Sequence, residues 1–330
     1  MSELILGIET SCDDTAIALV NERGDVISSV ISSQIDIHNE FGGVYPEFAA
    51  REHIQTIIPT IKAAFDKANV NPKDIKGIGV TRGPGLVGSL LVGINTAIGL
   101  GHGWNKPVIG VNHLRGHLRS ADLEEQRVKF PATVLLVSGG HTFLAHMKNP
   151  TDVQLLSSTR DDSVGECYDK VGRMLGLGYP GGPKVDRLAK QGKPTIPFPR
   201  PMMDKGLEFS FSGLKAAVSR FLAASDDHVD ADVAASFVAA VLDILMKKSE
   251  RALKKHRSAS FVIVGGVAAS PQIRASAKEL SDKMGVELCL PPTKWATDNG
   301  AMIALAAWDY FKSGIMKPPK VQLNLTMSEF

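Results

Sequence analysis

The feature that most constrains the fold is a pattern that occurs twice: a buried strand, a short polar or glycine-rich turn, and a returning strand. The first copy has strands at 4–9 and 15–20 around a turn at 10–14, and the second copy covers residues 132–147. Helices alternate with single strands after each copy, which favours an α/β protein with an internal repeat. Turns of this kind present backbone N–H groups that bind phosphate or other anions. Together with a third glycine turn at 265–266, the two copies predict a nucleotide-binding protein.

The composition is that of an ordinary globular chain. With 330 residues, 44% of them apolar and 22% charged, the chain is long enough for two lobes that each bury a core. The net charge is only +2, so any RNA contact must come from a local basic patch. Three cysteines without a CxxC pair argue against a disulfide framework and fit a reducing compartment.

The sequence also disfavours a membrane protein and two nucleotide-binding classes. No apolar run reaches the ~18 residues that a membrane span needs. The first strand begins at Leu4, which leaves no room for a signal or transit peptide, so we expect a cytoplasmic protein, or one of the mitochondrial matrix. The patterns GxxxxGKS/T and GxGxxG after a strand are absent, which disfavours P-loop and Rossmann chemistry.

Two histidines are the first candidates for metal binding. His113 and His117 follow a strand predicted at 108–111 and are four residues apart, so on a helix both imidazoles would project from one face and could share an ion. A pair of surface histidines is the alternative, because HxxxH also arises by chance. A zinc protease requires HExxH, in which the glutamate activates water. Since position 114 is Leu114, the pair could hold a metal but not serve that kind of hydrolase.

A third ligand must be an acid or imidazole that folding brings near, and Asp298 is the best candidate. It stands just before a helix predicted over 299–311. The alternative is that Asp298 only caps this helix. Two histidines and a carboxylate would leave positions open for water or substrate, as expected for a catalytic site, and they suit Fe(II) and Zn alike.

Other charged residues could contact a substrate. Asp13 and Asp14 lie in the first turn, where function and ordinary turn chemistry explain them equally well. Asp186 follows a Pro/Gly-rich turn at 180–183 and could contact the hydroxyls of a ribose. A basic cluster at 247–257 either forms a solvated helix end or contacts RNA phosphates. A further acidic group stands before and within a helix predicted at 165–175: Asp161, Asp162, Glu166 and Asp169.

Eight short motifs follow one another along the chain. They are GIETSCDDT at 7–15, GPG at 83–85, NHLRGH at 112–117, VSGGHT at 137–142, YPGGP at 179–183, FSFSGLK at 209–215, GGV at 265–267 and TDNG at 297–300. In this order they resemble the bacterial and mitochondrial type of the tRNA threonylcarbamoyladenosine transferase family (TsaD), and the resemblance runs from Leu4 to about Phe311.

The resemblance implies an α/β fold of the actin/hexokinase/Hsp70-like (ASKHA) type, with two lobes and two ββ-turn phosphate loops. We expect an N-terminal lobe at 1–111, and a C-terminal lobe at 112–311 with the metal and nucleotide site in the cleft. The segment 312–330 would pack on the first lobe. The implied reaction transfers threonylcarbamoyl from threonylcarbamoyl-AMP to N6 of adenosine 37, in tRNAs that read codons beginning with A, and releases AMP.

The resemblance also implies roles for individual residues. His113, His117 and Asp298 would hold one divalent metal ion, with Fe2+ favoured and Zn2+ as the alternative. Asp13 and Asp14 would be needed for activity. The nucleotide portion would be held by Leu136, Val137, Ser138, Gly139, Gly140, Asp169, Gly182, Asp186 and Ser270.

This sequence departs from the family pattern at two positions. Bacterial members usually have glutamate where this chain has Arg115, which changes a local contact but no ligand. The family often has asparagine where this chain has Ser270, whose shorter side chain puts its binding role in doubt.

The implied partners are tRNA and either protein subunits or a second copy of the chain. The subunits would be a degenerate paralogue of the TsaB type and an ATPase of the TsaE type, and a homodimer is the alternative. Three other functions compete with this one. A metalloprotease would need a water-activating glutamate, which is lacking here. A sugar or acetate kinase on the same fold would have no use for the two histidines, and a non-enzymatic scaffold would not need the whole ligand set.

Overall fold

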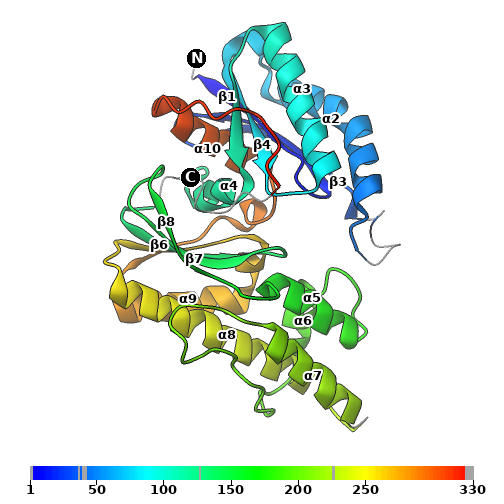
Figure 1. The fold of residues 1–330 in the computed structure, drawn as a ribbon, viewed down its shortest axis with the longest axis vertical. Helices are drawn as coiled ribbons and strands as arrows, with labels where there is room; N and C mark the ends of the chain where they lie inside the picture. The colour runs from blue at the N-terminus through cyan, green and yellow to red at the C-terminus, as the bar shows by residue number, and fades with distance from the viewer. Residues whose placement is uncertain (1–2, 36–37, 39–42, 126–127, 225–226, 324–330) are drawn as a thin grey trace. The chain divides into compact units, whose positions relative to one another are not determined.

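A computed structural model describes residues 3–35, 38, 43–125, 128–224 and 227–323 (Figure 1). The chain divides into two compact units. Unit 1 comprises residues 1–127, 150–152 and 291–330, and unit 2 comprises residues 128–149 and 153–290. Within the described ranges, no helix combines the length and the apolar character needed to span a membrane.

Unit 1 is built on a five-stranded sheet with the order β3-β2-β1-β4-β5. The antiparallel pairs β1–β2 and β2–β3 form one side of the sheet, and the parallel pairs β1–β4 and β4–β5 form the other. Its strands are β1 (Leu4–Glu9), β2 (Asp14–Asn21), β3 (Val26–Ser33), β4 (Ile75–Gly83) and β5 (Val108–Asn112). Its helices are α2 (Pro46–Ala68), α3 (Val87–Trp104), α4 (His113–Arg119) and α10 (Gly300–Lys312), with short 3-10 turns at Pro72–Asp74, Ser120–Asp122 and Thr293–Trp295.

Alternation of side chains along β1 separates two cores in unit 1. Leu4, Leu6 and Ile8 belong to a cluster with α2 and α3, whereas Ile5 belongs to a cluster with α10. Helices α2 and α3 therefore cover one face of the sheet and α10 covers the other (Figure 1). The C-terminal ends of β1, β4 and β5 all lie at one edge of this sheet, because the three strands are parallel.

Unit 2 repeats the topology of unit 1. Its sheet has the order β8-β7-β6-β9-β10, again with two antiparallel pairs followed by two parallel ones. The strands are β6 (Ala132–Val137), β7 (Thr142–Met147), β8 (Val153–Ser158), β9 (Ser260–Val264) and β10 (Glu287–Cys289). The helices, packed on one core with β6, β7 and β9, are α5 (Val164–Met174), α6 (Gly182–Ala189), α7 (Ser212–Ala224), α8 (Asp230–Lys255) and α9 (Pro271–Met284), and a 3-10 turn spans Gly266–Ala269. The predicted repeat of strand, turn and strand is confirmed in both units.

Three elements of unit 2 have weak sequence signals. Strand β8 is largely exposed at the sheet edge, and β10 has only three residues. Helix α9 buries few apolar side chains among many polar ones, so its apolar periodicity is sparse.

The division into units differs from the predicted lobes of 1–111 and 112–311. Residues 112–127 and 291–311 belong to unit 1, because α4 and α10 pack on the first sheet. The proposed metal ligands therefore lie in unit 1, and the residues proposed to hold the nucleotide lie in unit 2. In the C-terminal segment, the backbone N–H of Gly110 donates to the carbonyl of Lys317.

Candidate active site

Helix α4 begins directly where strand β5 ends. The side chain of Asn112, the last residue of β5, accepts hydrogen bonds from the backbone N–H groups of Leu114 and Arg115, at 2.8 and 3.4 Å. This N-cap starts the helix at His113 and places His117 one turn further on. The two imidazole rings lie edge to face with their centroids 4.7 Å apart. The predicted projection from one helical face is confirmed.

Asp298 does not cap the helix that follows it. The side chain of Asn299 accepts from the backbone N–H of Met302 at 2.9 Å and is the N-cap of α10. The carboxylate of Asp298 is instead turned to the histidines. Its Oδ1 lies 3.0 Å from Nε2 of His117 and 3.6 Å from Nε2 of His113. The capping alternative is therefore wrong for Asp298, and Asn299 caps α10 instead.

These three side chains form a group that could hold a metal ion. One ligand atom from each of His113, His117 and Asp298 lies within 4.8 Å of the other two. Both imidazoles are buried, whereas the Asp298 side chain is 29% exposed, so one side of the group is open. Imidazole nitrogen and carboxylate oxygen suit several divalent metals. The donor set thus fits a divalent ion with positions left for other ligands.

A buried carboxylate, Glu9, contacts this group from behind. Glu9 is the last residue of β1 and is 1% exposed. Its Oε2 lies 3.0 Å from Nδ1 of His113, and it accepts a hydrogen bond from the Thr81 hydroxyl at 2.5 Å. Its Oε1 accepts from the backbone N–H of Ser11 at 2.6 Å. Glu9 was not among the predicted site residues, although an acid that ends a wholly buried strand was a signal.

The two carboxylates set the charge of His113. Burial alone would lower the pKa of this imidazole, but Asp298 and Glu9 outweigh burial and raise it to about 9. In return, the pKa of Glu9 is lowered: its own burial is the largest single cause and works in the opposite direction, but the charge and hydrogen bond of His113 together with the hydrogen bond from Ser11 outweigh it. The two carboxylates therefore favour the positively charged form of the His113 imidazole.

Helix α4 also packs against α10. A Cβ on Gly116 would lie 2.8 Å from Cδ1 of Ile303, so the two helices meet closely there. The guanidinium of Arg119 donates to Asp309 at 2.7 Å and also pairs with Asp122. Arg115, where the family usually has glutamate, is fully buried, lies 5.2 Å from the centroid of the Tyr310 ring and donates to a backbone carbonyl.

The first turn, with Asp13 and Asp14, is held by α2 and α3. His53 of α2 donates from Nε2 to the carbonyl of Cys12 at 2.9 Å. The hydroxyl of Thr10 donates to the carbonyl of Ser89 at 2.9 Å. The small residues of α3 allow this approach, because a Cβ on Gly93 would lie 2.3 Å from the Thr10 hydroxyl oxygen.

The surroundings of Asp14 disfavour the charged form of its carboxyl group. Burial, with smaller contributions from the neighbouring charges of Asp13 and Asp298, raises its pKa to about 6. A hydrogen bond with Ser33 works in the opposite direction. One oxygen of this carboxylate is buried without a hydrogen-bond partner among the described residues. An acid kept in such a position is more easily explained by function than by turn formation.

The second turn lies in unit 2 and includes Ser138, Gly139 and Gly140. The backbone N–H of Ser138 donates to the carbonyl of His141 at 2.9 Å, which closes the turn. A Cβ on either glycine would meet no atom within 4 Å, so the turn is open on that side. The N-terminal end of α5 is tied to the turn, because the N–H of Gly165 donates to the Ser138 carbonyl at 3.2 Å. Leu136 and Val137 are buried in strand β6.

Asp169 and Gly182 meet each other directly. Oδ1 of Asp169 accepts from the backbone N–H groups of Gly181 and Gly182, at 2.8 and 3.4 Å. This carboxylate therefore fixes the glycine turn at the start of α6. Burial raises the pKa of Asp169, and these two hydrogen bonds oppose the rise.

Asp186 and Ser270 also lie together. Burial raises the pKa of Asp186, while its interactions with Ser270 and Tyr168 lower it. The Ser270 hydroxyl oxygen additionally caps α9, where it accepts from the N–H of Ile273 at 3.4 Å. A Cβ on Gly265 would lie 3.3 Å from Cβ of Ser138, so this end of β9 adjoins the second turn. The nucleotide-binding residues that we predicted all lie in unit 2, where Asp169 contacts Gly182 and Asp186 contacts Ser270.

The remaining charged groups have structural partners. Asp161 accepts four hydrogen bonds from the serines and backbone of the FSFSG motif, at Ser210, Phe211 and Ser212. In the basic cluster, the buried Lys248 donates to three backbone carbonyls, and Arg251 donates to two. These contacts give Lys248 and Arg251 structural roles, and an RNA contact by the other basic residues of the cluster stays a prediction.

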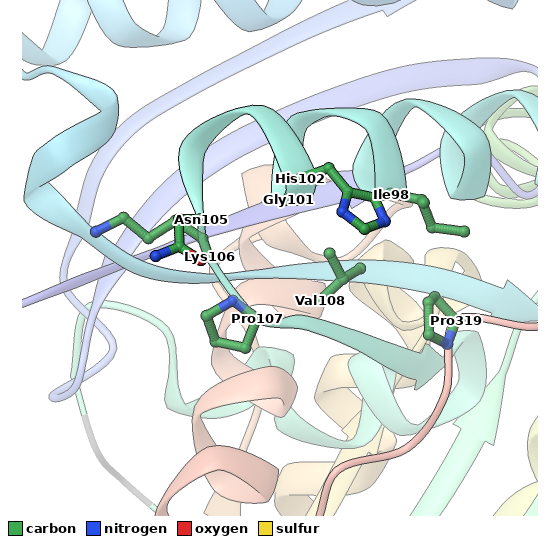
Figure 2. Close-up of a pocket in the computed structure, with 8 residues that line it drawn as sticks. All are labelled: Ile98, Gly101, His102, Asn105, Lys106, Pro107, Val108 and Pro319. Carbon is green, nitrogen blue, oxygen red and sulfur yellow. The ribbon is translucent and has the colours of Figure 1, made fainter.

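A surface pocket of about 530 Å3 lies elsewhere in unit 1. Figure 2 shows its lining between the end of α3, the start of β5 and the C-terminal segment, with His102, Val108 and Pro319 among the labelled residues. Its one lining residue in β5, Val108, stands at the N-terminal end of the strand, whereas His113 follows the C-terminal end. The pocket is therefore separate from the candidate metal site.

Known proteins resemble this chain in sequence. A profile of the family described as TsaD, tRNA N6-adenosine threonylcarbamoyltransferase, matches residues 25–305. The protein of that name from Thermosipho africanus is 48% identical over 316 residues, covering 94% of this chain and 96% of its own length. The protein of that name from Bacillus subtilis is 46% identical over 317 residues, covering 94% and 91%.

Solved structures share the fold at low sequence identity. HypF from T. kodakarensis has a TM-score of 0.66 at 13% identity, over 97% of this chain and 49% of its own. Component A of the (R)-2-hydroxyglutaryl-CoA dehydratase from Acidaminococcus fermentans has a TM-score of 0.56 at 16% identity, over 93% and 98%. With the repeated sheet topology, these similarities confirm the predicted α/β fold of ASKHA type. The sequence matches go further than the fold, because they cover nearly the whole chain at almost half identity. The chain belongs to the tRNA N6-adenosine threonylcarbamoyltransferase family, TsaD.

Proposed function

We propose that this chain transfers the threonylcarbamoyl group of threonylcarbamoyl-AMP to N6 of adenosine 37 in tRNAs that read codons beginning with A. The observation that carries the proposal is the open-sided group of His113, His117 and Asp298 in a chain of this family. A tRNA substrate also supports the cytoplasm as the place of reaction.

In this reaction the N6 amine attacks the carbamoyl carbon of the adenylate. A C–N bond forms, the bond from that carbon to the phosphate oxygen breaks, AMP leaves, and the amine loses one proton. The adenosine amine is a weak nucleophile but the acyl donor is already activated. The chain therefore has to position the reactants and stabilise charge more than it has to supply a strong base.

We propose that His113, His117 and Asp298 hold one divalent ion, with Fe2+ favoured and Zn2+ as the alternative. Such an ion supplies Lewis-acid polarisation of a carbonyl oxygen. The chain contributes the orientation of the ligands: the Asn112 cap directs the two imidazoles, and the Asn299 cap releases Asp298 from helix capping.

We assign binding of the adenylate to the segments that contact one another in unit 2. The open turn at 138–140 would receive the phosphate with backbone N–H groups. Asp186 is buried beside Ser270 and would accept from ribose hydroxyls, as would Leu136 to Gly140 through their backbone. Asp169 acts by holding Gly182 in place through two hydrogen bonds to the turn.

We propose that Asp13 and Asp14 serve the proton released from N6. Asp14, with a pKa of about 6, is poised to exchange a proton near neutral pH. Its location in the first turn, held by His53 and Thr10, gives the carboxyl a defined position.

Replacing Asp14 by asparagine is expected to raise stability while lowering activity. The pKa rises from 3.8 to about 6 on folding, so the folded state keeps this proton to higher pH than the unfolded state. The carboxyl therefore costs more stability as pH rises from about 4 to about 6, and the full cost remains above pH 6. At pH 7.5 the free energy of unfolding of the variant should exceed that of wild type by roughly 1–3 kcal/mol, and at pH 4 by little. Urea titrations at both pH values measure this, and equal stability at pH 7.5 contradicts it.

We further propose that a protein partner covers part of unit 1, either the paralogous TsaB-type subunit, which would act with a TsaE-type ATPase, or a second copy of this chain. Ile54 and Ile58 of α2 and Val87 and Leu91 of α3 are 44–64% exposed. Neighbouring exposed apolar side chains on two packed helices are typical of an interaction surface. Light scattering of the purified chain distinguishes a dimer from a monomer that awaits its partner.

The reaction itself is tested with the purified chain, threonylcarbamoyl-AMP and unmodified tRNA. Modified adenosine is measured by mass spectrometry of the digested tRNA, with and without added partner subunits. Modification by the chain alone supports both the reaction and independence from partners. No modification under either condition, with tRNA that a known family member modifies, would refute the proposed function.

A further inference from the structure

We propose that Glu9 is a positioning residue that fixes the tautomer of His113, so that the lone pair of Nε2 points at the metal site. The inference rests on the metal site of the proposed function and adds a residue to it. Its basis is the contact of 3.0 Å between Oε2 of Glu9 and Nδ1 of His113. The other nitrogen of the same ring, Nε2, faces Asp298.

The surroundings of Glu9 show that it acts as an acceptor only. Three donors converge on this one buried carboxylate: the Ser11 backbone N–H at 2.6 Å, the Thr81 hydroxyl at 2.5 Å, and Nδ1 of His113. A carboxylate offers no proton of its own, so Nδ1 must carry the hydrogen in this contact. A neutral imidazole with hydrogen on Nδ1 has its lone pair on Nε2, which is then free to bind a metal.

The Ser11 side chain could not make this choice by itself. Its hydroxyl lies 3.2 Å from Nδ1 of His113, and a hydroxyl can either donate or accept. With Ser11 alone, the neutral imidazole could adopt the tautomer with hydrogen on Nε2. That hydrogen would then point into the metal site. Glu9 removes this option, because its contact with His113 is favourable in one tautomer only.

The position of Glu9 is itself rigid. It ends a central strand that pairs with β2 on one side and β4 on the other, and its side chain is 1% exposed. Thr81 reaches it from β4, so two neighbouring strands determine where the carboxylate lies. A carboxylate behind a metal-binding histidine is an arrangement that raises ligand basicity and holds ring orientation.

Replacement of Glu9 by glutamine tests the role. The amide must turn either its oxygen or its NH2 group to the Ser11 N–H. With its oxygen there, the NH2 group faces His113 and stabilises the hydrogen on Nε2, which blocks the metal site. With its NH2 group there, the amide N–H and the Ser11 backbone N–H are two donors that face each other, which is unfavourable. Either outcome should weaken binding of Zn2+ alone, measured by competition with a chromophoric chelator, by about 10–100-fold.

Two matched variants separate this role from general support of the fold. Thr81→Val removes another donor to the same oxygen of Glu9 but leaves the His113 contact, and Glu3→Gln makes the same chemical change just before β1. Both should bind Zn2+ within about 3-fold of wild type. Thermal unfolding of each metal-free variant reports its folding. The proposal is overturned if Glu9→Gln binds Zn2+ like wild type, or if Thr81→Val loses as much affinity.

Nitrogen-15 NMR of the zinc-saturated wild-type chain tests the tautomer without any variant. We expect a protonated Nδ1 and a zinc-bound Nε2 for His113. Zinc on Nδ1 would overturn the inference even if the metal site is real. A wild-type chain that binds no zinc and no Fe2+ would instead overturn the metal site of the proposed function, and the role of Glu9 with it.

Discussion

A chain with His117 replaced by glutamine is expected to lose metal binding and threonylcarbamoyl transfer while keeping its fold. Nε2 of His117 lies 3.0 Å from Asp298, and its Nδ1 has no hydrogen-bond partner within the described part of the chain. Glutamine nearly fills the space but offers no imidazole lone pair. Loss of a direct ligand should weaken metal binding by more than the ~10–100-fold typical of outer-shell changes, and transfer should fall at least as far.

His117 is a cleaner target than His113 for a physical reason. Removing His113 would leave the carboxylate of Glu9 buried without its cation, and an unpaired buried charge costs about 3–5 kcal/mol. A loss of activity in a His113 variant would therefore mix the loss of a ligand with damage to the fold. Among the residues that the structure describes, the charged partner of His117 is Asp298, whose side chain reaches solvent.

The measurement combines bound metal, transfer and thermal unfolding. Metal is quantified by mass spectrometry of the purified chain, and transfer by modified adenosine in tRNA. His102→Gln provides the control, because His102 is exposed on α3 in unit 1 and lies in the separate pocket. Wild-type turnover by the His117 variant without bound metal would show that these side chains do not act through an ion.

Local sequence patterns account for much of the fold. The strands of both hairpins, helix α8 and helix α10 follow directly from apolar periodicity and turn residues. The assignment of α4 and α10 to unit 1 could not be derived in this way. It depends on packing between residues separated by nearly the whole chain, such as the hydrogen bond from the Trp308 indole to the Val20 carbonyl.

The candidate metal site shows the same limit at the level of single residues. His113 and His117 could be paired from their spacing alone. Asp298 and Asn299 are both good helix caps, so the sequence could not decide which of them caps α10 and which faces the histidines. Glu9 was overlooked because its partners, Thr81 on β4 and His113 on α4, are far away in the sequence.

Replacing Gly7 by alanine is expected to damage the fold and the metal site together. A Cβ at Gly7 would lie 2.0 Å from the carbonyl oxygen of Gly300 and 2.7 Å from the backbone nitrogen of Ala304. Backbone atoms cannot swing aside, so α10 would have to move away from the sheet. Forced overpacking of this kind costs about 3 kcal/mol or more.

The same displacement would reach the metal ligand. Asp298 stands two residues before Gly300, where α10 begins, so it would be carried away from His113 and His117 with the helix. We therefore expect weaker Zn2+ binding as well as a lower free energy of unfolding in urea. Gly99→Ala is the matched control, since its Cβ would meet nothing within 4 Å and alanine is the better helix former by about 1 kcal/mol. Unchanged Zn2+ affinity in a clearly destabilised Gly7 variant would show that α4 and Glu9 hold the ligands in place, and that the packing of α10 against the sheet does not.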